Sequence, residues 1–394
     1  MITSAWGKLW RRKEDSSWQH IHTKRRVRFK MSFEGKTTLY ATVENAPFVI
    51  RDVAESGTQG DYKIVVTGVV KNNLFWKYVT KKVAYPSKCR CTIELDLSAV
   101  EGLSEISVFH RYSSELYSYD DVCYFDSNPF PVTSVILPDS VMFIDKEAFA
   151  MKVDGAGHVP ISKLESIHLP SSVQFIARSA FANCKNLKSV SIPGSVAFIA
   201  RGAFSGCTGL ESASIAQGVK AIARGAFSGC TALDHITIPG STERIVKNTF
   251  AGCTGLKAIE IADGLKAIEA GAFGGCKSLE SIAIPASVET IGDQAFASCT
   301  SLKSIEIAEG LKAIEAGAFG GCKSLESIAI PASTKRIDFY AFIGCENLSS
   351  ITYAGTMEQW TAIEIVETTP SGATYERDYL YDVWATVACS GDQA

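Results

Sequence analysis

The sequence predicts a β-rich leucine-rich repeat solenoid of short strands and tight helical turns, with a small β-rich region before the array and a cap after it. Two features predict this fold: a cysteine and a phenylalanine that each recur every 23 residues. A strict period of roughly 20 to 50 residues is typical of stacked supersecondary units. The predicted structural ladder consists of Phe181, Phe204, Phe227, Phe250, Phe273, Phe296, Phe319, Phe342, Cys184, Cys207, Cys230, Cys253, Cys276, Cys299, Cys322 and Cys345.

The composition is that of a protein with a core. Of the 394 residues, 46% are hydrophobic and 21% are charged, which excludes wholesale disorder. The net charge of −3 argues against nucleic acid as the main partner. No run approaches the roughly 18 apolar residues of a spanning helix, so we expect no transmembrane segment.

Each coil follows the consensus L-x-x-I-x-I-P-x-S-V-x-x-I-x-x-x-A-F-x-x-C-x-x. In I-x-I the alternation has period two, so Ile282 and Ile284 point to one side of a short strand. Pro285 ends that strand because proline donates no ladder hydrogen bond. The V-x-x-I element, as in Val288 and Ile291, supplies a second inward pair, and A-F-x-x-C forms the tight helical turn.

A single coil cannot fold alone. Its apolar groups, about seven in number, contribute roughly 1.5–3 kcal/mol each when they are buried. Ordering the 23 residues of the coil costs about 1–2 kcal/mol per residue. Stacking, with hydrogen bonds between the strands of neighbouring coils, is therefore required.

We interpret the ladder cysteines as small buried hydrophobic residues that stack from coil to coil. Disulfides between neighbouring coils are the alternative, since strands about 4.8 Å apart lie within bridging range, but pairing would break the even spacing. Outside the ladder, Cys89 and Cys91 would share one strand face, which is a weak metal signal without nearby partners. We favour a structural role for both.

Part of the array has grown by duplication. The segments 256–287 and 302–333 differ only at Ala258/Ser304 and Asp263/Glu309. Copying a pair of coils, 46 residues long, lengthens the array and gives no sign of a unique pocket.

The consensus resembles the BspA-like leucine-rich repeat family, a 23-residue class of bacterial surface and secreted proteins. The resemblance covers nine coils at residues 132–354, and the tail at 355–394 looks like the closing cap of such arrays, with Trp360 over the last coil. It implies a non-enzymatic scaffold for protein–protein or host-surface binding, as in adhesins. It also implies a protein or extracellular-matrix ligand and a cell-surface or secreted location. A structural spacer or stalk that presents the N-terminal region is the alternative function.

Residues 34–131 are predicted to be a β-rich region and a leading cap coil with an insertion. If the L-S-E-I of residues 103–106 is a degenerate V-x-x-I, Ile106 matches Ile144 and the segment between them is longer than one coil. We favour a lid over the first coil for this insertion. A binding patch is the alternative, because tyrosine is enriched in hot spots; its candidate residues are Tyr112, Tyr117, Tyr119, Asp120, Asp121 and Tyr124.

Residues 1–33 are predicted to be a basic, disordered leader. The first 30 residues hold nine lysines and arginines against Glu14 and Asp15. No apolar segment of a secretory signal follows these charges, so a cytoplasmic location stays an alternative. We favour a solvated extension, or sequence upstream of a start at Met31, over a tail that binds acidic lipid or nucleic acid.

No pattern in the sequence predicts catalysis. Its six histidines lie in no metal-ligand or catalytic spacing, and we expect His168 and His235 to face outward. Phosphate loops, dinucleotide fingerprints and nucleophile elbows are missing. We therefore expect no catalytic residue, no cofactor and no metal. The outward strand positions are small and mildly polar, so high affinity would require the aromatic N-terminal segments or multivalent display.

Overall fold

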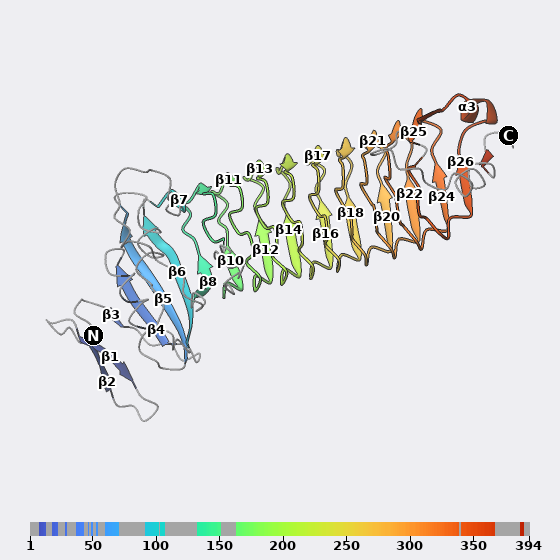
Figure 1. The fold of residues 1–394 in the computed structure, drawn as a ribbon. Coiled ribbons are helices and arrows are strands. Elements are labelled where there is room, and N and C mark those ends of the chain that lie inside the picture. The colour runs from blue at the N-terminus through green and yellow to red at the C-terminus, as the bar shows by residue number, and fades with distance from the viewer. Residues whose placement is uncertain are drawn as a thin grey trace, which may run out of the picture. The chain divides into compact units, whose positions relative to one another are not determined.

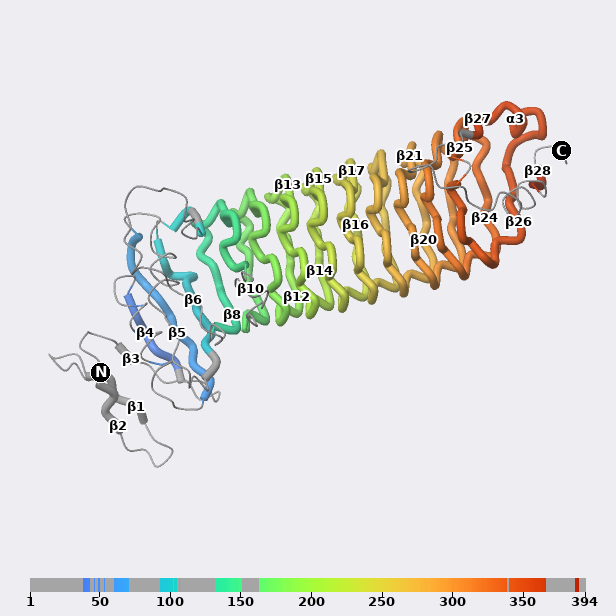
Figure 2. Tube along the Cα trace, viewed as in Figure 1, coloured from blue at the N-terminus to red at the C-terminus, as the bar shows by residue number. Residues whose placement is uncertain are grey.

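The computed structural model describes residues 8–12, 18–22, 28–29, 37–42, 46, 49, 53, 60–70, 91–101, 103–106, 132–150, 163–338, 340–366 and 387–389. The chain forms two compact units, Met1–Val173 (unit 1) and Gln174–Ala394 (unit 2). Figure 1 shows their strands, and Figure 2 follows the path of the chain through the coils of unit 2.

Unit 1 is built on strands that lie side by side in a mostly parallel sheet. Its order is β3 (Arg28–Phe29), β4 (Thr37–Thr42), β5 (Gly60–Val69), β6 (Cys91–Glu101), β8 (Val132–Ile136) and β10 (Ser166–His168), and only β3 runs antiparallel to its neighbour. In β5 the side chains alternate: Ile64 and Val66 are buried, whereas Lys63 points outward. This period-two pattern builds one apolar face and one polar face.

Two further strand pairs belong to unit 1. Strands β7 (Glu105–Ile106) and β9 (Phe143–Ile144) pair in parallel, and the register places Ile106 opposite Ile144, which is the match that the sequence pattern predicts. Strands β1 (Lys8–Arg12) and β2 (Trp18–His22) pair antiparallel within the leader for which we predict disorder.

Each coil of unit 2 contributes two short parallel strands, one to each of two rows (Figure 1). Partners in adjacent coils lie 23 residues apart, as in Ser189↔Ser212 and Ile268↔Ile291. The first row comprises β12 (Ser189–Ile192), β14 (Ser212–Ile215), β16 (His235–Ile238), β18 (Ala258–Ile261), β20 (Ser281–Ile284), β22 (Ser304–Ile307), β24 (Ser327–Ile330), β26 (Ser350–Tyr353) and β28 (Ala388–Cys389). The second row comprises β11 (Phe175–Ile176), β13 (Phe198–Ile199), β15 (Ala221–Ile222), β17 (Arg244–Ile245), β19 (Ala267–Ile268), β21 (Thr290–Ile291), β23 (Ala313–Ile314), β25 (Arg336–Asp338) and β27 (Glu364–Val366).

A stack of phenylalanine rings runs through the core of unit 2. From Phe181 to Phe342, successive ring centroids are 5.0–5.5 Å apart and the ring planes lie within 10° of parallel. Each ring is buried, and so is every ladder cysteine. These observations confirm the predicted β-rich repeat solenoid, because the core repeats with the same period as the sequence.

The ladder cysteines are thiols, and they connect one coil to the next. The Sγ of Cys276 donates a hydrogen bond of 3.3 Å to the carbonyl oxygen of Phe250 in the preceding coil. The same bond, 3.1–3.3 Å long, recurs at Cys207, Cys230, Cys253, Cys299, Cys322 and Cys345. The thiol thus serves both as a small apolar residue and as a weak donor to a buried carbonyl.

The A-F-x-x-C segments form successive hydrogen-bonded turns. The amide of Ser205 donates to the carbonyl of Gly202, and the amide of Cys207 donates to that of Phe204, so each bond spans three residues. A second corner requires glycine. Gly264 has a φ of 130°, and a Cβ there would lie 2.0 Å from the carbonyl oxygen of Gly240. Coils therefore approach closely at this corner.

A short cap follows the last coil. Helix α3 (Met357–Thr361) begins with a capping box in which Thr356 and Gln359 bond to each other's backbone amides. The ring of Trp360 lies 5.4 Å from that of the buried Tyr353 and is tilted by 54°. Trp360 therefore packs on strand β26 of the first row.

Candidate functional site

The outward residues of the first row form a small-residue surface. Ser189, Ser191, Ser214 and His235 are exposed, and so is His168 in unit 1, as the sequence predicts. Neighbouring hydroxyls satisfy each other: the Oγ of Ser214 donates to that of Ser191 at 3.1 Å. A surface of this kind offers little apolar area to a ligand.

The second row carries two exposed aromatic rings. Phe175 and Phe198 lie opposite each other in register on β11 and β13, with 45% and 39% of their areas exposed. Farther along the same row the next outward residues are Ala221, Arg244 and Ala267, so within unit 2 the exposed aromatic residues of this row lie in its first two coils. Phe143, the first residue of β9 in unit 1, occupies the corresponding position of its F-I pair and is also 39% exposed. Sequence analysis missed this pair, although F-I in place of A-I or R-I at these positions was its signal.

Three residues after each of these aromatic positions stands an exposed cation. Arg178, Arg201, Arg224 and Lys247 occupy the same position in four successive coils, and all four are exposed. Backbone hydrogen bonds stack the coils here, since the amide of Gly202 donates to the carbonyl of Arg224 at 3.1 Å. Among the described residues, none of the four cations has an ion-pair partner.

Other cations of unit 2 do have partners. Carboxylates of adjacent coils pair with them at Lys188–Glu211 (2.9 Å), Lys257–Asp234 (2.7 Å), Lys303–Glu280 (3.0 Å), Lys312–Glu289 (2.6 Å), Lys323–Glu346 (2.6 Å), Arg244–Glu269 (2.5 Å) and Arg336–Glu315. Most of these side chains are exposed, and such pairs contribute only about 0–1 kcal/mol each. These pairs neutralise the charges of their own lysines and arginines. The four cations Arg178, Arg201, Arg224 and Lys247 differ from them, because no carboxylate of the described residues neutralises their charge.

We call the segments 174–180, 197–203, 220–226 and 243–249 the basic edge. They contain the cations Arg178, Arg201, Lys220, Arg224, Arg244 and Lys247 and a single carboxylate, Glu243. In the next three coils the same positions, 266–272, 289–295 and 312–318, hold Lys266 and Lys312 against Glu269, Glu289, Asp293 and Glu315. The charge of this edge therefore reverses where the duplicated coils begin.

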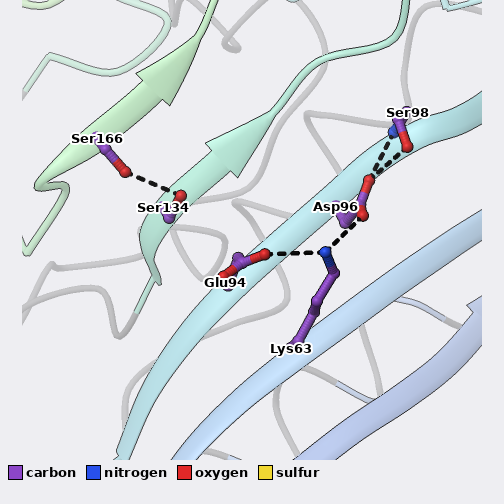
Figure 3. A network of polar contacts seen from close by, with 6 residues as sticks. All are labelled: Lys63, Glu94, Asp96, Ser98, Ser134 and Ser166. Carbon is purple, nitrogen blue, oxygen red and sulfur yellow. Dashed lines mark hydrogen bonds and ion pairs between the residues drawn. The ribbon is translucent and has the colours of Figure 1, made fainter. Parts of the chain in front are cut away.

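Unit 1 carries a polar network on the outward face of its sheet (Figure 3). The Lys63 Nζ lies 3.0 Å from carboxylate oxygens of both Glu94 and Asp96, and Ser98 donates from its amide and its hydroxyl to Asp96. Burial opposes the ionisation of Asp96, but the bonds from Ser98 and Lys63 outweigh it and lower the pKa of this carboxyl. The bond to Asp96 raises the pKa of Lys63. The network joins β5 to β6, because Lys63 of β5 pairs with two carboxylates of β6.

Replacing Asp96 by asparagine should lower the free energy of unfolding by about 1–2 kcal/mol at neutral pH, because Lys63 and Ser98 lose a charged acceptor. The pKa of Asp96 lies below its ordinary value of 3.8 in the folded state. Its stabilisation is therefore complete above about pH 4 and is lost as the pH falls through the lowered value. Urea denaturation at a series of pH values from about 7 to 2 should show the free energies of unfolding of the wild type and of Asp96→Asn becoming equal at the acidic end.

Glu101→Gln, at the exposed end of the same strand, is the control and should change stability little at either pH. If the Asp96→Asn difference persisted undiminished at the acidic end, the ion pair would not be its source.

The candidate residues predicted from the sequence, Tyr112, Tyr117, Tyr119, Asp120, Asp121 and Tyr124, lie outside the described residues, so the proposed patch stays a prediction. Within the described ranges, no group of three or more potential ligands could hold a metal ion. The helical segments of the same described residues lack the length and hydrophobicity of a membrane span.

A scan of protein families matches the repeat. The model described as BspA type leucine rich repeat region (6 copies) matches residues 160–280 and 266–363, which together span more than half of the chain. No curated protein matches the chain.

The chain is similar to several solved structures of leucine-rich repeat proteins. A leucine-rich repeat protein of T. pallidum is 29% identical, with a TM-score of 0.38 over 51% of this chain and 80% of that one. A leucine-rich cell surface protein of Faecalibacterium prausnitzii is 24% identical, with a TM-score of 0.36 over 88% and 98%. A leucine-rich repeat protein of Eubacterium ventriosum is 18% identical, with a TM-score of 0.43 over 88% and 95%.

Proposed function

The chain belongs to the BspA-type leucine-rich repeat family, and from this premise we propose that it is a non-enzymatic, adhesin-like scaffold that binds a protein or extracellular-matrix ligand at a cell surface. In such a scaffold the coils carry no chemistry of their own. They hold rows of outward side chains at a fixed repeat, and a ligand is bound by whichever of these rows offers apolar area or charge.

The observation that carries this proposal is the exposed pair Phe175 and Phe198. Both rings stand on rigid strands in register, and 45% and 39% of their areas are in contact with solvent. Aromatic side chains are enriched at the centres of protein interfaces, and truncating one of the few hot-spot residues there costs about 2 kcal/mol or more of binding energy. Because the later coils of unit 2 hold small or charged residues at these positions, such as Ala221 and Arg244, the pair is the apolar anchor of this row in unit 2.

The double variant Phe175→Ser/Phe198→Ser should weaken binding to an immobilised extracellular-matrix protein extract at least about tenfold, equivalent to about 1.4 kcal/mol. The full chain is titrated over the coated surface, and circular dichroism shows that the variant is folded. The matched control is Met357→Ser/Ile365→Ser, which removes exposed apolar area near the cap and should leave binding unchanged. Equal binding by both double variants would contradict the proposal.

A spacer or stalk is the second candidate, and the duplicated coils favour it. Their repeated side chains lengthen unit 2 without adding an exposed aromatic residue to the second row, where Ala267, Thr290 and Ala313 stand. A stalk that binds only through the N-terminal region keeps its full affinity in Phe175→Ser/Phe198→Ser, so the same titration separates the two functions.

A further inference from the structure

We propose that the basic edge, together with Phe175 and Phe198, binds an acidic polysaccharide that carries a carboxylate on each sugar ring. This inference rests on the proposed binding function and names the class of ligand. It starts from three properties of the edge: its uncompensated charge, its repeat distance and the aromatic rings beside it.

The charge of the edge requires an anion. Arg178, Arg201, Arg224 and Lys247 are exposed and have no ion-pair partner among the described residues, whereas other cations of unit 2 pair with carboxylates of adjacent coils. Three of the four are arginines, whose planar guanidinium groups bind a carboxylate through two parallel hydrogen bonds. With Glu243 as the one carboxylate in these segments, the edge attracts a polyanion along its whole length.

The repeat distance favours a sugar chain over other polyanions. Successive coils are spaced by 5.0–5.5 Å where the phenylalanine rings stack, so the cations recur at about that interval. An extended acidic peptide places side chains of one face about 6.7 Å apart, and a stacked nucleic acid strand rises about 3.4 Å per phosphate along its axis. Both drift out of register with the cations over four coils. A chain of six-membered sugar rings advances per ring by an interval between these two, close to the spacing of the coils, so its carboxylates stay within reach of the long side chains of the cations.

The aromatic pair supplies the second half of a sugar site. Phe175 and Phe198 lie three residues before Arg178 and Arg201 in the same two coils, and their rings are exposed. A sugar ring has apolar C–H faces as well as polar edges, so it can lie against an aromatic ring while its carboxylate reaches the neighbouring guanidinium. Peptide or phosphate backbones have no such apolar face.

The duplicated coils mark where the site ends. Where the row of cations would continue, unit 2 has Ala270, Asp293 and Ala316, and the neighbouring positions add Glu269 and Glu315. A polyanion bound along the basic edge is repelled beyond Lys247. The site therefore spans four coils, and we expect it to hold a segment of about four sugar rings.

The test uses the full chain and fluorescently labelled polygalacturonate oligomers, which carry one carboxylate per ring, in about 0.15 M salt. Binding is followed by anisotropy. The triple variant Arg178→Ser/Arg201→Ser/Arg224→Ser should bind at least tenfold more weakly than the wild type. Replacing the same three residues by lysine keeps the charge but not the paired hydrogen bonds, and it should restore binding only in part. The matched control is Lys188→Ser/Lys257→Ser/Lys303→Ser, which removes equal charge from residues that are paired, and it should bind like the wild type.

Polyglutamate and a single-stranded oligonucleotide serve as competing polyanions, and an uncharged glucose oligomer tests the aromatic contact alone. Tighter binding of either competitor would overturn the proposal in favour of an acidic peptide or a nucleic acid. The proposal would also be overturned if the wild type did not bind polygalacturonate. The same holds if the triple arginine-to-serine variant and the triple lysine-to-serine control lost affinity equally. If the wild type binds the matrix extract but not polygalacturonate, only this inference fails. If Phe175→Ser/Phe198→Ser leaves matrix binding intact, the proposed function fails instead.

Discussion

Replacing Phe273 by alanine should lower the free energy of unfolding by about 3–5 kcal/mol, the range found when a buried phenylalanine leaves a cavity. Its ring is fully buried and lies between those of Phe250 and Phe296, at centroid distances of 5.4 and 5.2 Å. Alanine would remove both stacking contacts at once. The neighbouring backbones, joined by the inter-coil bond from the amide of Phe273 to the carbonyl of Ala295, cannot collapse to fill the space.

The loss should spread beyond one coil, because a coil is stable only through its interfaces with its neighbours. Urea denaturation of the full chain, followed by far-ultraviolet circular dichroism, measures the change. Phe198→Ala is the matched control, since that ring is 39% exposed and its removal leaves no closed cavity. A loss below about 1 kcal/mol at Phe273, within the range of ordinary surface changes, would mean that the phenylalanine stack is not the core.

The solenoid could be predicted because its core residues repeat with one period. Every coil must present the same side chains to its neighbours, so one consensus describes the inward positions, including Ile282, Ile284 and Val288, which are buried. The cap contact of Trp360 follows the same logic, because an array that ends must cover its last apolar layer. The A-F-x-x-C segment was predicted less closely. The backbone hydrogen bonds of this segment join residues three apart, and its described copies form successive turns but no continuous helix.

The candidate site could not be predicted in the same way, because outward residues are free to differ from coil to coil. Phe175 and Phe198 occupy positions that hold Ala221 and Arg244 farther along, so no period marks them. Likewise, the sequence does not show which cations form ion pairs. Only the structure shows that Lys188 and Arg244 pair with carboxylates of adjacent coils whereas Arg178 and Arg201 do not.

The polar network of unit 1 was also beyond the reach of the sequence. It depends on the register between β5 and β6, which places Lys63 opposite Glu94 and shifts between Val65 and Thr67. Register in an irregular sheet follows from packing and bulges rather than from a repeat. No 23-residue spacing relates Lys63 to Asp96, so their pairing had no signal in the sequence.

The rates at which the cysteines react with iodoacetamide, mapped residue by residue with mass spectrometry, test the continuous buried spine most directly. Burial raises the pKa of Cys207, and the thiolate is the reactive form. Labelling of Cys207 and the other seven ladder cysteines should therefore require unfolding of their coils and be at least about a thousandfold slower in the native protein than in denaturant, given a stability of about 5 kcal/mol or more. Phe273→Ala should accelerate labelling of the coils around it. Native labelling of the ladder thiols at the rate of an exposed cysteine would contradict the fold and the binding function that depends on it.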